Sequence, residues 1–301
     1  MTVLPFSPVI DQRVVDRYRR NYGLGNDIGA NHVKSHWELE IALTDKLLKS
    51  TKAERRKVFS ECYTELYAKL PWLNKAETRS YDYSRWGRLI NKKSRIIEIG
   101  SGNAQLLKYL ASLGHDCVGT EITDERGAKH AGDAELKWHL TDGVNLAQFE
   151  AESSYDVVIS SQVVEHLHPD DILEHFYNAK KILKEGGRYI FDTPLIGTGP
   201  ADLSLVFGFD RPVCMHLKEY SFLEMRHLLK RAGFSSVDAV LYRRWPVPIG
   251  PYSSSWYFRY CCAWDWLIER IGMSPRFERR LRKYILRLLF VPTGIWLCAI
   301  K

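Results

Sequence analysis

Short apolar runs rich in β-branched residues recur through the middle of the chain, and each ends in polar or glycine-containing sequence. The first run, 94–99 (SRIIEI), is followed by glycines and predicts a buried strand. Similar runs at 115–122, 134–140 and 155–161 predict three more strands. The segment 104–114 (AQLLKYLASLG) opens directly after the first turn and has the spacing of a helix.

Helical periodicity dominates residues 8–70. It is clearest in 35–50 (SHWELEIALTDKLLKS) and 52–70 (KAERRKVFSECYTELYAKL), and Pro71 is expected to end the second helix. We therefore predict an amino-terminal helical cap over residues 1–80 that ends in a polar linker near 74–93.

The turn after the first strand carries the most informative chemistry. Glu98 precedes Gly100-x-Gly102, and the glycines allow a tight turn and a close approach of the backbone to a ligand. A helix that starts there offers free N–H groups to a polar or anionic group. A dinucleotide fingerprint needs a third glycine where this chain has Gln105. The E-x-G-x-G pattern instead resembles motif I of the class I S-adenosylmethionine-dependent methyltransferases.

The elements that follow match this family in order. The second strand ends in Glu121, nineteen residues after Gly102, and Asp142 follows the third strand. The fourth strand runs into 162–194, which resembles the family's segment from strand four through helix D to strand five. A helix before strand six and a terminal strand, 294–301 (GIWLCAIK), complete a resemblance over residues 80–243 plus the last ten.

The resemblance implies an α/β, Rossmann-like fold with a seven-stranded, mostly parallel sheet and helices on both faces. The catalytic domain is expected at 81–243 and 292–301. Residues 194–215, rich in Gly and Pro, are expected to form a loop over the active site. Residues 244–291 are predicted to be a helical insertion between strands six and seven.

The resemblance also implies S-adenosylmethionine as the cofactor. Gly100 and Gly102 are expected to approach its methionine part, and Glu98 its ammonium group. Glu121 is expected to accept hydrogen bonds from the ribose and Asp142 from the adenine. Gln162, directly after the fourth strand, completes the cofactor-binding candidates.

The insertion differs in composition from the rest of the chain. Its first helix is dense in aromatic side chains, and its second places apolar residues on one side and cations mainly elsewhere. The aromatic residues are Trp256, Tyr257, Phe258, Tyr260, Trp264 and Trp266; the apolar side has Phe277, Leu281, Tyr284, Ile285 and Leu288. Apolar stripes at helical spacing usually pack inward, which favours a lid. Contact with a membrane surface is the alternative.

Composition and charge limit the kinds of partner that the protein is expected to bind. The formal net charge of +7 would attract nucleic acid without sequence specificity. Methyltransferases acting on base amino groups commonly carry [DN]-P-P-[YF] where this chain has 160–162 (SSQ), so nucleic acid is not the expected substrate. No signal peptide or long apolar stretch is visible, and we expect a cytoplasmic protein, with peripheral membrane contact as the alternative.

The six cysteines show no metal-like spacing. They are Cys62, Cys117, Cys214, Cys261, Cys262 and Cys298. We expect buried free thiols, no structural zinc site and no metal ligands.

A hydroxyl acceptor must lose its proton around the time of methyl transfer. His166 and His216 are candidates for the base because histidine titrates near neutral pH, and Asp192 is a candidate for the acceptor pocket. His168, before Pro169, is expected to start a helix.

The sequence thus predicts methyl transfer to a small or medium-sized metabolite at oxygen. The alternatives are a peripheral membrane enzyme acting on a lipid, lipid-linked sugar or quinone-like acceptor, and a non-catalytic cofactor-binding domain. The acceptor and the oligomeric state stay open.

Overall fold

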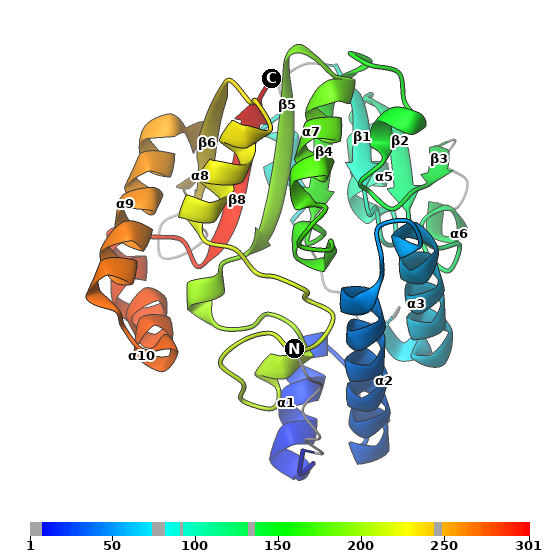
Figure 1. Cartoon of the computed structure of the whole chain (residues 1–301), viewed down its shortest axis with the longest axis vertical. Coiled ribbons are helices and arrows are strands. Elements are labelled where there is room, and N and C mark those ends of the chain that lie inside the picture. Colours follow the sequence, from blue (N-terminus) through cyan, green and yellow to red (C-terminus); the bar gives the residue numbers. More distant parts are fainter. Residues whose placement is uncertain (1–7, 74–81, 91–92, 132–135, 244–248) are drawn as a thin grey trace.

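An eight-stranded sheet with helices on both faces forms the centre of the computed structural model (Figure 1). The structure describes residues 8–73, 82–90, 93–131, 136–243 and 249–301. The strand order is β3-β2-β1-β4-β5-β8-β6-β7; β1 to β5 pair in parallel, and β8 is antiparallel to β5 and β6. This is the Rossmann-like α/β class that the sequence predicts. The strands are β1 Arg95–Ile99, β2 Asp116–Glu121, β3 Lys137–Leu140, β4 Tyr155–Ser161, β5 Leu183–Pro194, β6 Ser236–Arg243, β7 Ile249–Ser254 and β8 Gly294–Ile300.

The helices surround the sheet and also extend below it in Figure 1. They are α1 Gln12–Tyr22, α2 Ala30–Lys49, α3 Arg55–Lys69, α4 Ser84–Gly87, α5 Gln105–Ser112, α6 Ala128–Ala131, α7 Ile172–Ile182, α8 Phe222–Arg231, α9 Ser255–Ile271 and α10 Pro275–Arg280. A π-helical turn, Leu281–Ile285, and a 3₁₀ turn, Leu286–Leu289, continue the chain after α10.

The prediction of seven strands is wrong by one, because β7 arises in the segment expected to be helical. This strand pairs antiparallel with β6 at the edge of the sheet. Its sequence, IGPYSS, has no apolar alternation and contains Pro251, which an edge strand tolerates because one side of it needs no partner. An edge strand of this kind leaves little hydrophobic signal in the sequence.

Two hydrophobic cores cover the two faces of the sheet. One contains side chains of α7, α8 and α9, including Phe176, Phe222 and Phe258. The other contains α4 and α5, with Trp86 packed 5.2 Å from Trp296 of β8 between ring centroids. Trp86 lies within the predicted polar linker 74–93, of which 74–81 and 91–92 are outside the described residues.

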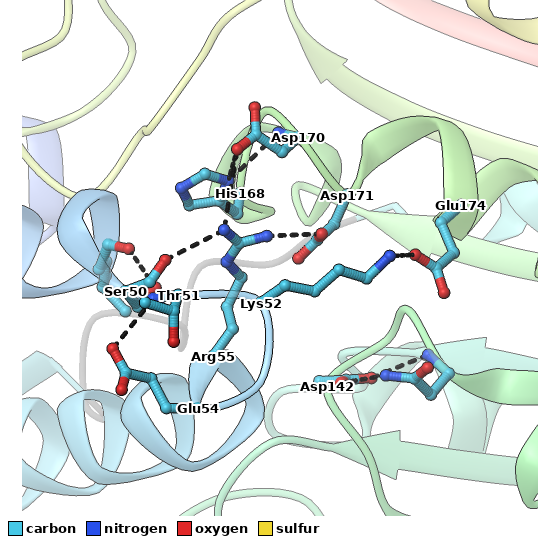
Figure 2. Close-up of polar contacts among 12 residues, drawn as sticks. Ser50, Thr51, Lys52, Glu54, Arg55, Asp142, His168, Asp170, Asp171 and Glu174 are labelled. Atoms are coloured by element: carbon cyan, nitrogen blue, oxygen red, sulfur yellow. Dashed lines mark hydrogen bonds and ion pairs between the residues drawn. The ribbon is translucent and has the colours of Figure 1, made fainter.

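The amino-terminal helices α1 to α3 lie beneath the carboxyl edge of the strands (Figure 1). Figure 2 shows the polar contacts that join the start of α3 to the start of α7. Arg55 donates to Asp171 at 2.6 Å, with 10% and 9% of the two side chains exposed. Lys52 donates to Glu174 at 2.5 Å. Because the first pair is shielded from water, loss of either partner would leave the other charge buried, which would weaken the connection between α3 and the start of α7.

Residues 195–215, all but the first of the predicted loop, form an irregular segment with 3₁₀ turns at Ile196–Thr198 and Leu203–Leu205. Leu203 and Val206 pack with Val15 and Trp37 of the amino-terminal helices. This segment therefore connects the sheet edge to α1 and α2. All six cysteines are buried and free, as predicted.

Candidate active site

Two adjoining cavities open at the carboxyl ends of β1, β2 and β4. The first, of about 140 Å³, and the second, of about 450 Å³, share four lining residues. The shared residues are Gly100, Arg126, Gln162 and His166. In open α/β sheets this edge is where ligands bind, because the loops that leave parallel strands converge there.

Gly100 directly follows strand β1 and lines both cavities. Its φ of +66° is a left-handed conformation that favours glycine. A Cβ at this position would lie 2.7 Å from Cγ2 of Val163, which is closer than real contacts allow. The absence of a side chain is therefore required by both the backbone and the packing.

Glu121 lines the first cavity together with Gly100, so the predicted bend and the predicted carboxylate face one space. The Gly102 N–H donates to its Oε1 at 2.5 Å, and the Ile122 N–H donates to Oε2 at 3.3 Å. Burial raises the pKa of Glu121 to about 7, and these two backbone N–H groups oppose the rise. Part of the Glu121 population is therefore protonated near neutral pH.

Glu98 lines the second cavity and is only 3% exposed. Burial, assisted by the negative charge of Glu121, holds the pKa of Glu98 well above its usual range. Within the described part of the chain, its Oε2 atom is buried and has no hydrogen-bond partner. Such an atom is costly unless a ligand group pairs with it, and a cationic ammonium group is a suitable partner.

Asp142 also lines the first cavity, but its oxygens already have partners. Oδ1 accepts from the N–H groups of Val144 and Asn145, each at 2.9 Å, and Oδ2 accepts from the Asn145 side chain at 2.7 Å. Asp142 thus holds the turn after β3, as an aspartate before a glycine commonly does. Only its remaining lone pairs are available to accept a hydrogen bond from an adenine.

Gln162 connects the two cavities with a third one of about 570 Å³. Its φ of +56° is uncommon for a residue with a side chain and is often found at functional sites. Asp192 lines the third cavity, where Arg85 lies 3.8 Å away. Burial raises the pKa of Asp192, and hydrogen bonds with Ser161 and the charge of Arg85 oppose the rise.

The three catalytic candidates do not converge on one cavity. His166 lines the first two cavities, whereas Asp192 lines the third. His216 is 8% exposed and packs edge-on against His166, with 4.7 Å between ring centroids. His168 accepts from the Asp170 N–H at 3.2 Å, which places it in the turn before α7.

The two histidines have opposite pKa shifts. Burial and the neighbouring charge of His216 lower the pKa of His166 to about 3. Burial alone would lower the pKa of His216, but its hydrogen bond to Glu219 and the charges of Glu165 and Asp202 raise it to about 9. At neutral pH His216 already holds its proton, and His166 is a weak base, so neither is suited to remove a proton unaided.

Several lining residues come from α3, far in sequence from the glycine bend and the carboxylates that follow it. Phe59, Tyr63 and Tyr67 line the first cavity, and Arg126 donates to the Tyr67 hydroxyl at 2.9 Å. Their helical spacing on 52–70 was a detectable signal, but it indicates only that one face of α3 is buried. The partner of that face could not be identified without the fold.

The sheet order, the glycine bend and the carboxylate at the end of β2 define a class I methyltransferase domain. A family of methyltransferase domains matches residues 76–239, which is more than half of this 301-residue chain. The chain therefore belongs to that family, and its cofactor is S-adenosylmethionine.

Two curated relatives match about half of the chain. One is a ubiquinone biosynthesis O-methyltransferase of Ruegeria sp. strain TM1040, 30% identical over 155 residues, with 48% of this chain and 61% of that protein covered. The other is a probable S-adenosylmethionine-dependent methyltransferase of Mycolicibacterium smegmatis, 26% identical over 147 residues, with 48% of this chain and 53% of that protein covered. The chain thus spans less than two thirds of the length of either relative.

Solved structures share the fold at low sequence identity. An S-adenosylmethionine-dependent methyltransferase from Archaeoglobus fulgidus has a TM-score of 0.51 and 17% identity, covering 79% of this chain and 99% of that one. A 1,6-didemethyltoxoflavin-N1-methyltransferase from Burkholderia thailandensis has a TM-score of 0.50 and 14% identity, covering 84% and 91%. These likenesses establish the fold alone.

Proposed function

We propose that this protein transfers a methyl group from S-adenosylmethionine to the oxygen of a small or medium-sized metabolite. The observation that carries the proposal is that Gly100 and Glu121 line one cavity, which meets a third cavity at Gln162. The cofactor would occupy the first two cavities. Glu98, with an unpaired buried oxygen, would hold its ammonium group, and Glu121 its ribose hydroxyls. The bound cofactor supplies a methyl group that its sulfonium has already activated.

The third cavity is the proposed acceptor pocket. Its volume of about 570 Å³ lies in the range of roughly 300–1,000 Å³ that is usual for small-molecule sites. Tyr242, Phe290 and Trp296 offer aromatic surface, and Arg243 and Arg287 offer positive charge. This combination suits an acceptor with an apolar body and an acidic or strongly polar group. The ubiquinone-pathway relative is named as an O-methyltransferase, which favours oxygen as the methylated atom.

Asp192 is the proposed proton acceptor in this pocket. It is buried, its pKa is raised, and its Oδ1 has no hydrogen-bond partner within the described residues. A carboxylate of raised pKa accepts a hydroxyl proton more readily than an ordinary one. The insertion contributes Tyr257, Arg287 and Phe290 to the same cavity, which supports its predicted role as a lid.

The test is a turnover assay with S-adenosylmethionine and a panel of phenols, hydroxy acids and sugars, with S-adenosylhomocysteine formation as the readout. With a productive acceptor, Asp192→Asn should lower kcat about 10²- to 10⁴-fold, as loss of a general base does, while cofactor affinity changes little. Asp210→Asn, on the surface beside Arg276, is the control. Cofactor binding without turnover on any panel member, including lipids, would favour the non-catalytic reading.

A second candidate, a peripheral membrane methyltransferase, is favoured by apolar side chains that the insertion leaves exposed. The expectation that the apolar side of the second insertion helix packs inward is wrong for most of its residues. The exposed residues include Trp256 at 77%, Phe277 at 57%, Tyr284 at 64%, Ile285 at 57% and Leu288 at 68%. Arg280, Lys283 and Arg287 are exposed on the same segment and suit anionic headgroups. The helices of the described residues are all too short or too polar to span a lipid bilayer.

Flotation with vesicles tests this candidate. The protein should bind phosphatidylglycerol vesicles more strongly than phosphatidylcholine vesicles. The Trp256→Ser/Leu288→Ser double variant should bind at least about tenfold less, because each substitution removes apolar surface that would be buried in the membrane. Leu113→Ser, 51% exposed and at the end of α5 rather than in the insertion, is the matched control. Equal flotation of all three proteins would rule out docking through the insertion.

A further inference from the structure

Three side chains with metal-binding atoms meet beside the cofactor cavities. Glu165, His166 and His216 each offer one ligand atom, and these atoms lie within 4.8 Å of one another. Glu165 and His166 follow β4, and His216 comes from the segment before α8, so the fold brings them together across about fifty residues of sequence. Glu165 is fully buried, and His216 nearly so.

The hydrogen bonds of the two imidazoles leave one nitrogen of each ring for coordination. Nδ1 of His166 lies 3.0 Å from the carbonyl oxygen of Met215 and must donate to it. Nδ1 of His216 lies 2.9 Å from Oε1 of Glu219 and donates to that carboxylate. The Nε2 atom of each ring remains, and that of His216 must release its proton when a metal ion binds. Metal-binding histidines commonly have this arrangement, in which the second nitrogen donates to a carbonyl or carboxylate and fixes the ring orientation.

The carboxylates beside the two imidazoles can still accept a hydrogen bond or bind a cation. Oε2 of Glu165 accepts from the Thr193 hydroxyl at 2.9 Å, which leaves Oε1 buried with no hydrogen-bond partner within the part of the chain described. Glu219 is held in place by the Ala201 N–H, which donates to its Oε1 at 2.7 Å. A buried carboxylate oxygen without a hydrogen bond is costly, and a divalent ion would offset that cost more fully than the single proton of His216 does.

We propose that Glu165, His166 and His216 bind a divalent transition-metal ion, with Glu219 and Met215 orienting the two histidines. Two imidazoles and one carboxylate are the ligand set of Zn²⁺, Mn²⁺ or Fe²⁺ sites that keep open positions, whereas Mg²⁺ and Ca²⁺ prefer oxygen ligands alone. Metal–ligand bonds of about 2.0–2.2 Å place ligand atoms roughly 3–3.5 Å apart, so binding requires the three atoms, now within 4.8 Å of one another, to move closer together.

The place of the site in the fold gives the ion a defined neighbourhood. His166 lines both cofactor cavities, so an ion on its Nε2 would lie at their wall. The sequence indicates both histidines only as candidate bases, because nothing in their spacing of about fifty residues shows that they meet beside Glu165.

The proposal is tested with tag-free protein that has been treated with a chelator and then titrated with Zn²⁺ by calorimetry and with Co²⁺ by visible absorption. We expect one equivalent to bind, with Co²⁺ giving d–d bands. His216→Ala and the nearly isosteric Glu165→Gln should each weaken binding at least about 100-fold. Glu219→Gln, which alters only the orienting group, should weaken it about 10- to 100-fold.

His139→Ala, on β3 and outside the cluster, is the matched control and should bind as the parent does. Binding of S-adenosylhomocysteine by every variant shows that each has folded, and it separates this proposal from the proposed function. Failure of the folded parent to bind a stoichiometric ion, or equal affinity in His216→Ala and His139→Ala, would overturn the metal site. Metal binding without methyl transfer would instead count against the proposed function.

Discussion

Replacing Glu121 with alanine should weaken S-adenosylmethionine binding about a hundredfold or more. The carboxylate is proposed to accept hydrogen bonds from both ribose hydroxyls, and a hydrogen bond to a charged group contributes about 1.5–3 kcal/mol. The variant also loses the bond from Gly102 N–H that holds the glycine turn beside the cavity. Calorimetry measures the change. Asp116→Ala, at the opposite and exposed end of β2, is the control and should bind normally.

The same residue gives cofactor binding a pH dependence. Because burial raises the pKa of Glu121 to about 7, the fraction of ionised carboxylate falls as the pH drops below that value. If the cofactor binds the ionised form, affinity should fall towards tenfold per pH unit below pH 7 and level off above it. Glu121→Gln should bind weakly with a smaller pH dependence, the remainder coming from Glu98. A parent affinity that is constant from pH 5.5 to 8 would contradict the assigned role.

The central parallel strands β1, β2 and β4 could be predicted from sequence because they are buried on both faces. Such strands read as continuous apolar runs, and the predicted 155–161 coincides with β4, Tyr155–Ser161. The glycine bend was equally visible, since the left-handed φ of Gly100 leaves a glycine in the sequence. Local backbone geometry and burial on both faces determine directly which residue types occur at a position, so both can be predicted from the sequence.

Features that depend on distant contacts could not be predicted. The edge strand β7 has no apolar periodicity, and the sequence cannot indicate which surface the buried face of α3 covers. The pKa shifts of His166 and His216 differ in sign because only His216 has the carboxylates of Glu219, Glu165 and Asp202 around its ring, and the sequence does not show that Glu165 and Asp202 approach it. From sequence alone, His166 and His216 were therefore equally good candidates for the base.

Removing Arg282 should destabilise the protein by about 3–5 kcal/mol, because it leaves the carboxylate of Asp265 buried without its counter-ion. The two side chains are 3% and 1% exposed, and Arg282 donates to Asp265 at 2.7 Å. Asp265 also accepts from the Phe222 N–H at 2.6 Å, so it joins α9 to the start of α8. The free energy of unfolding of Arg282→Met, measured with guanidinium, tests the prediction.

The double variant Asp265→Asn/Arg282→Met separates an unpaired charge from lost packing. Asparagine keeps an acceptor for Phe222, and neither charge remains, so the double variant should recover most of the stability that Arg282→Met loses. Burial raises the pKa of Asp265 even with Arg282 beside it, so desolvation outweighs the ionic attraction. Lys49→Ala breaks an exposed pair with Asp45 and should cost less than about 1 kcal/mol. If the double variant were as unstable as Arg282→Met, the cost would lie in packing of the insertion against α8 rather than in charge burial.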